Sequence, residues 1–235
     1  MEIKEVINEV INESFRILSE LKKTGFSNET KLIIPNRKDC KNSTDDPDSK
    51  DAIRVSEQEL RFVFVEQLNK KLSSGYYYSI ETPTEDKYKF SENGKECKPV
   101  RGIGQSGNFD LTIQNANKEK IAIIEFKSKS ATHHSYAKDL CKLWNKDEGN
   151  GDKTLRYFIN VFETMDGKTR GKVIEKITNN EYFQKQADDI SVTIVCKSLT
   201  EGQKEFELFK EDDDKNITCY QNIISYVYIV STLNC

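Results

Sequence analysis

Two short apolar segments separated by a polar stretch place the strongest constraint on the fold. Residues 109–113 (FDLTI) alternate apolar and polar side chains, and residues 121–127 (IAIIEFK) form an apolar run that ends in charge. Both patterns are typical of β-strands. The stretch between them contains Asn115 and Asn117, so the two segments are expected to form an antiparallel hairpin.

Charged side chains interrupt the apolar face of this hairpin. Strand side chains alternate between faces, so Glu125 and Lys127 share a face that is otherwise apolar. Buried charges are costly unless they are paired or bound to metal. The simplest register places Asp110 opposite Glu125, with about 5 Å between Cβ atoms. A slip of one residue would put the two acids on opposite faces, and the sequence does not fix the register.

Such a pair of carboxylates predicts a metal site. Two like charges at this distance repel unless a divalent cation lies between them. Oxygen ligands favour Mg²⁺, or Mn²⁺, over Zn²⁺. The expected ligands are Asp110, Glu125 and the backbone carbonyl of Phe126. Lys127 would orient an attacking water or help to deprotonate it, and would neutralise charge on a phosphate.

At these residues the chain resembles the PD-(D/E)XK nuclease superfamily. That family carries an Asp on one strand and Glu-x-Lys on the next; here these are Asp110, Glu125 and Lys127, with fourteen residues between the acids. Phe109 stands where the family has Pro. The resemblance implies a restriction endonuclease-like core and Mg²⁺-dependent hydrolysis of phosphodiester bonds, in DNA more than in RNA. Double-strand cleavage would need two active sites, hence a homodimer.

In this family a helix ahead of the strands often adds an acidic ligand. The sequence predicts a helix from Ser56, because Ser56 and Glu59 have the spacing of a capping box. Glu57 borders the expected buried stripe and is the favoured ligand. Glu59 is the next candidate, despite its competing role at the cap, and Glu66 is expected on a solvated face.

Basic residues after the Glu-x-Lys strand are candidates for binding nucleic acid. A helix is expected over residues 135–146, and in the family the corresponding helix packs near the active site. His133 and His134 would either contact phosphate or form an exposed loop pair, which we favour. Lysines on this side would either form a basic rim or lie on an ordinary solvated face; the candidate contacts are Lys129, His133, His134, Lys138 and Lys142.

The remaining segments predict one mixed α/β unit, a central sheet flanked by helices, preceded by an N-terminal helix. We expect residues 1–50 to form an amphipathic helix (2–23, ending at Gly25) and a polar linker, and residues 51–235 to form the nuclease-like domain. Helix is also expected over 169–187, and a long polar connection over 83–108. Further strands are expected over 76–82, 155–162, 190–197 and 223–231.

Composition excludes some classes of protein. The net charge of −3 is unlike that of a basic nucleic-acid coat protein, and no apolar run approaches the ~20 residues of a membrane span. The six cysteines lack zinc spacing and are expected to be free thiols in a cytoplasmic protein. Two alternatives to the nuclease stay open: a non-catalytic nucleic-acid-binding or assembly subunit on the same fold, and an unrelated α/β interaction domain.

Overall fold

The computed structural model describes residues 2–35, 53–128, 131–162, 192–199, 217–222 and 225–230. The expected helix over 169–187 and most of the polar linker lie outside these residues, as does Lys129. The elements, in chain order, are α1 (Ile3–Thr24), α2 (Glu57–Lys71), β1 (Tyr76–Glu92), β2 (Lys95–Arg101), β3 (Gln105–Asn115), β4 (Lys120–Ser128), α3 (His133–Leu143), η2 (Gly151–Lys153), β5 (Leu155–Phe162), β6 (Val192–Ser198), β7 (Ile217–Asn222) and β8 (Ser225–Val230).

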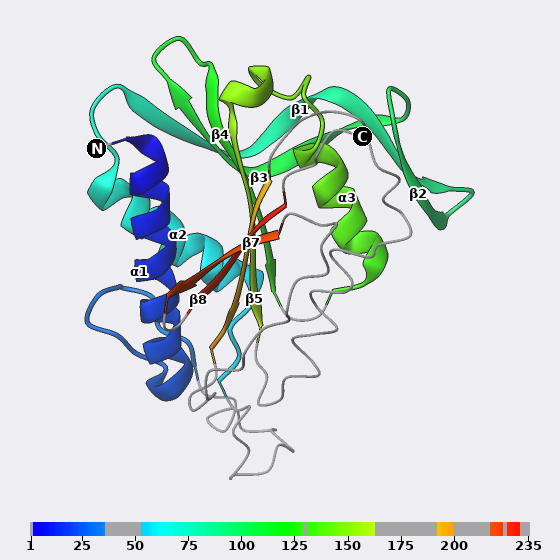
Figure 1. The fold of residues 1–235 in the computed structure, drawn as a ribbon. Coiled ribbons are helices and arrows are strands. Elements are labelled where there is room, and N and C mark those ends of the chain that lie inside the picture. The colour runs from blue at the N-terminus through cyan, green and yellow to red at the C-terminus, as the bar shows by residue number, and fades with distance from the viewer. Residues whose placement is uncertain are drawn as a thin grey trace.

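The strands form one mixed sheet, which confirms the α/β class. Its strand order is β2-β1-β3-β4-β5-β6-β8-β7. β4, β5 and β6 run parallel, whereas the pairs on either side of them are antiparallel. β7 was not expected from the sequence. Figure 1 shows α1 and α2 on one face of the sheet and α3 on the other.

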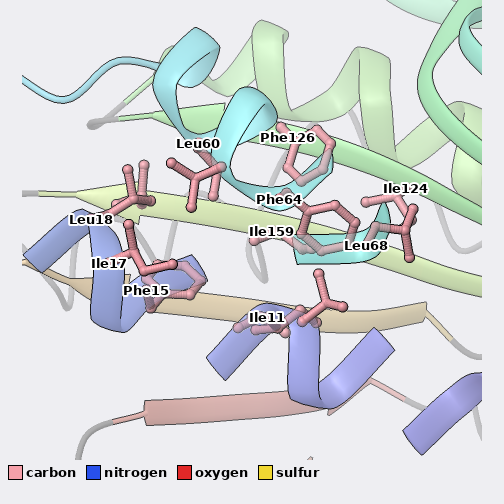
Figure 2. Packing of buried hydrophobic residues seen from close by; sticks show 14 of the residues in the cluster. Ile11, Phe15, Ile17, Leu18, Leu60, Phe64, Leu68, Ile124, Phe126 and Ile159 are labelled. Atoms are coloured by element: carbon pink, nitrogen blue, oxygen red, sulfur yellow. The ribbon is translucent and has the colours of Figure 1, made fainter. Parts of the chain in front are cut away.

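Two apolar clusters hold the helices to the sheet. On the α1–α2 face, Phe64 packs edge-on against Phe126, with ring centroids 5.1 Å apart. Figure 2 shows how α1, α2 and the central strands contribute to this cluster. On the other face, Leu140 and Leu143 of α3 pack with Phe158 of β5. Adjacent residues of β4 therefore enter different clusters, as strand alternation requires.

The N-terminal helix belongs to this core. Its buried stripe, which includes Ile7, Val10 and Leu18, lies in the same cluster as α2 and the sheet. Gly25 ends the helix in the left-handed conformation (φ 72°), and a Cβ there would lie 2.6 Å from Ile34 O. The expected helix and its stop at Gly25 are confirmed. The placement of a domain boundary near residue 50 stays a prediction.

The expected connection over 83–108 is wrong, because this segment is largely a β-ribbon. β1 continues to Glu92, turns at Asn93 and Gly94, which both have positive φ, and returns as β2. The ribbon is exposed on much of both faces, so its sequence lacks the alternation that marks a half-buried strand. The Asn-Gly pair was the available hairpin signal.

The hairpin has the register that was the simplest of those left open by the sequence. Ile113 pairs with Ala122 and Leu111 with Ile124, and the turn falls between Asn115 and Lys120. Ladder pairing between β3 and β4 stops at Leu111 and Ile124. Asp110 is the first β3 residue beyond that pairing, so it lies where the two strands separate; we call this place the β3–β4 fork.

Other sequence predictions have mixed outcomes. The β5 boundaries are as expected, and Cys196 is a buried free thiol. Burial raises the pKa of the Cys141 thiol, also free, to about 11. Over the described ranges, the longest helices are too polar to cross a membrane.

Candidate active site

Seven charged side chains from α2, β3, β4 and α3 meet at the fork. Each touches at least one of opposite sign, in an unbroken series from α2 to α3. We call this set the fork cluster; its members are Glu57, Arg61, Asp110, Glu125, Lys127, Asp139 and Lys142.

Asp110 ties the fork together through both carboxylate oxygens. Oδ2 accepts a hydrogen bond from the backbone N–H of Phe126 at 2.7 Å, in place of a ladder acceptor. Oδ1 accepts one from Arg61 Nη2 at 2.5 Å. In a strand, a residue's N–H and C=O point to the same side, so the Phe126 carbonyl also faces the fork.

The strand alternation breaks at Asp110. Phe109 and Leu111, two residues apart, belong to clusters on opposite faces of the sheet. The β1 residue opposite Asp110 is Glu81, whose φ is 51°. Such a conformation is unusual for a residue with a side chain and marks a local distortion of the ribbon.

As a result, the two predicted ligands approach the fork from different sides. Asp110 contacts Arg61 of α2, whereas Glu125 contacts Lys142 of α3. The regular alternation does not extend past Leu111, so one shared face for the two acids stays a prediction. Asp110 is nevertheless close enough to Glu125 to help raise its pKa.

Glu125 is the most deeply buried acid of the cluster, at 1% exposure. Burial raises its pKa well above the usual value, Asp139 and Asp110 add to the effect, and Lys142 opposes it. The ammonium of Lys142 contacts Glu125 Oε1, and the hydrogen bond between the two groups favours the ionised carboxylate.

Lys127 connects the two helices. Its Nζ lies 2.6 Å from Asp139 Oδ2 on α3 and 3.7 Å from Glu57 Oε2 on α2. Burial disfavours the ammonium, but Asp139 and Glu57 outweigh it and raise the pKa of Lys127. Lys127 is therefore a cation at neutral pH, able to neutralise an anion and unable to act as a base in this state.

Glu57 is the α2 acid that reaches the fork cluster, and Glu59 does not reach it. Glu59 accepts the Ser56 N–H at 2.7 Å in the capping box, so the cap role predicted for it is the one it has. Burial raises the pKa of Glu57, and Lys127 opposes that shift. Glu66, expected on a solvated face, accepts a hydrogen bond from Thr30 at 2.5 Å.

The candidate nucleic-acid contacts differ in their exposure in the structure. Lys142 is 6% exposed and points into the cluster, so it is not on a surface rim. His134 is also buried and both histidines begin α3, so the favoured exposed loop pair is wrong for His134. His133 is exposed, and Lys138 lies over the Phe90 ring at 5.0 Å.

Sequence reasoning missed Arg61 and Asp139. Asp139 lies three residues after Tyr136 and four before Leu143, both buried on α3. A carboxylate inside that apolar stripe was the available signal. Arg61 lies one turn after Glu57, a spacing that pairs opposite charges on a helix.

The donor chemistry of the fork fits a hard cation. The available atoms are oxygens of Asp110, Glu125 and Glu57 and the Phe126 carbonyl, which are the ligand types that Mg²⁺ takes. Within the described ranges, no three His, Cys, Asp or Glu side chains are already grouped to hold a metal. A bound cation would draw the acids away from their basic partners.

Comparisons with known proteins add no assignment. No protein-family model matches the chain, and neither does any curated protein or solved structure.

Proposed function

We propose that the protein is a metal-dependent nuclease that hydrolyses phosphodiester bonds, with DNA as the expected substrate. The observation that carries the proposal is the fork itself. The Asp110 carboxylate on β3 accepts the Phe126 N–H in place of a ladder acceptor, beside the end of β4 that carries Glu125 and Lys127. Glu57 of α2 contacts Lys127 there. Buried and half-buried charges at the end of strand pairing are costly unless they are paired or bind a ligand, and such clusters are common at functional sites.

In the proposed reaction, water attacks phosphorus, and the bond between phosphorus and the leaving sugar oxygen breaks. One proton of the water goes to the leaving oxygen and the other to solvent. A Mg²⁺ held by Asp110, Glu125 and the Phe126 carbonyl would supply Lewis-acid activation. Lys127, kept protonated by Asp139, stabilises negative charge on the phosphate. Glu57 holds the other side of that ammonium.

The test is cleavage of plasmid, linear and single-stranded DNA, and of RNA, with Mg²⁺ or Mn²⁺. Lys127→Met is expected to abolish cleavage, and Lys120→Met is the matched control, because Lys120 lies at the other end of β4 and contacts Glu85. Wild-type protein that binds neither metal nor nucleic acid would refute the proposal.

The pairing of every acid in the cluster with a basic side chain specifically favours a second candidate. A fully compensated cluster is also what a non-catalytic nucleic-acid-binding or assembly subunit would retain. Nucleic-acid binding that persists unchanged in EDTA, with no cleavage under any metal, would favour this subunit over the nuclease.

A further inference from the structure

The ammonium of Lys142 is surrounded by oxygens, as a bound cation would be. It contacts Glu125 Oε1, lies 2.7 Å from the carbonyl oxygen of Asn108 and 3.4 Å from Asp139 Oδ1. The Phe109 ring lies 5.5 Å away, ring centroid to Nζ. One carbonyl and two carboxylate oxygens are the ligand types that hard divalent cations take.

The backbone of β3 lies along this side chain. Gly107 lies beside the aliphatic stem of Lys142, since a Cβ there would be 3.4 Å from Lys142 Cδ, an ordinary van der Waals distance. The Asn108 carbonyl accepts a hydrogen bond from the Lys142 ammonium, and the Phe109 ring lies next to the same ammonium. The Lys142 side chain is only 7% exposed, so the ammonium is a built-in part of the site and not a surface charge that happens to approach it.

The charges of the fork cluster indicate how many metal ions it accommodates. Together with Glu81, which pairs with Arg61 at 2.6 Å, the cluster has five acids and three bases and a net charge of −2. One divalent cation would neutralise this charge. A second divalent cation would have to share Glu125 with the ammonium that already contacts it.

We propose that the Lys142 ammonium occupies the place of a second metal ion and thereby limits the fork to a single divalent cation. This rests on the proposed function, because it assumes that Glu125 ligates metal. Many phosphodiester-cleaving enzymes hold two metal ions about 3.5–4 Å apart. In this chain a lysine on α3 supplies the second positive charge permanently.

The experiment counts bound Mn²⁺ by the electron paramagnetic resonance signal of the free ion and by calorimetry. Wild-type protein is expected to bind one Mn²⁺ per chain, and Lys142→Ala, which empties the oxygen cage, is expected to bind two. Lys120→Ala is the matched control: its ammonium also lies near the Phe109 ring, at 5.7 Å, and beside a buried glutamate, Glu148. Because backbone N–H groups already occupy the Glu148 oxygens, this variant should still bind one.

Each outcome decides a different point. One Mn²⁺ in both wild type and Lys142→Ala overturns the role of Lys142 and leaves the metal site of the nuclease intact. Two Mn²⁺ in wild type likewise overturn it. No Mn²⁺ in either protein overturns both this inference and the proposed metal-dependent function.

A second variant keeps the test decisive if Lys142→Ala is poorly folded without metal. Lys142→Gln keeps most of the stem but removes the charge. It is expected to bind one Mn²⁺ about tenfold more tightly than wild type, because a repelling positive charge at contact distance is gone. Unchanged affinity in Lys142→Gln would contradict the proposal, and Lys142→Arg should restore wild-type binding.

Discussion

A buried glutamate lies near each end of β4, Glu148 from the segment after α3 and Glu125 from β4 itself, and the two are held in different ways. At the start of the strand, Glu148 accepts hydrogen bonds from the backbone N–H groups of Glu85 and Asp86 and from the Tyr88 hydroxyl, at 2.9–3.0 Å. At its end, Glu125 meets only the ammonium of Lys142 among the described residues.

Arg156, near the start of β4, is likewise held by backbone groups. Although it is only 2% exposed, it donates to the backbone carbonyls of Gly151, Thr154 and Glu148 at 2.6–2.8 Å. Burial lowers the pKa of its guanidinium, and Glu148 opposes that shift. Partners on the backbone cannot leave without unfolding a segment, whereas side-chain partners can move. The Glu148 network therefore fastens the ribbon, whereas the ion pairs of the fork cluster join side chain to side chain and can be exchanged for a ligand.

The largest expected effect is on stability at the Glu148 end. Glu148→Ala removes the acceptor of two half-buried backbone N–H groups and of the buried Tyr88 hydroxyl. Loss of one partner from such a buried charged network costs about 3–5 kcal/mol of unfolding free energy. Urea unfolding would measure this. A loss below about 1 kcal/mol would show that the network is not structural.

At the fork, the same kind of substitution should impair activity and spare stability. Asp110→Asn keeps an acceptor for the Phe126 N–H but removes the charge. Cleavage should fall on the order of 10²–10³-fold, as when one preorganised electrostatic group is removed. Asp147→Asn, at an exposed ion pair with Arg101, is the control. Equal cleavage by both variants would exclude a role for Asp110.

The pH dependence of metal binding should reflect the buried acids of the fork. Burial raises the pKa of Glu125 and of Glu57, so both keep their protons above the usual value of 4.5. A metal ligand must be ionised, so Mn²⁺ affinity should rise with pH through a midpoint above that value. Affinity that is flat from about pH 5 upward would contradict the raised pKa.

Without metal, the unfolding free energy should change with pH in the opposite direction to the metal affinity. Between 4.5 and the raised pKa of Glu125, the folded protein holds more protons than the unfolded chain. The unfolding free energy should therefore fall as pH rises through this window. Urea unfolding in EDTA measures it, and Glu125→Gln, which has no such proton to lose, should flatten the dependence.

The smallest expected effect concerns the helix that presents Glu57. Ser56 accepts the Gln58 N–H and closes a capping box with Glu59. Ser56→Ala should cost about 1 kcal/mol of unfolding free energy. Ser19→Ala, whose hydroxyl only donates back to Phe15 O within α1, is the comparison. A larger loss at Ser19 would show that the α2 cap is not limiting.

Local pattern determined much of this protein by itself. The apolar patterns predicted α1 and the boundaries of β5, and the Ser-x-x-Glu spacing predicted the α2 cap; the β3–β4 pairing has the simplest of the registers that the sequence left open. These depend on periodicity and short-range hydrogen bonds, which neighbouring residues specify. The sequence did not predict the exposed ribbon of β1 and β2, because the pairing of these strands buries no apolar face.

Only the tertiary structure decided which charges meet at the fork. Arg61, Asp139 and Lys142 lie far from Asp110 and Glu125 in the chain, and α2 and α3 bring them together from opposite faces of the sheet. The turn of Asp110 toward α2 follows from the end of strand pairing and the distortion at Glu81. Such contacts depend on how three layers pack, and no sequence period encodes that packing.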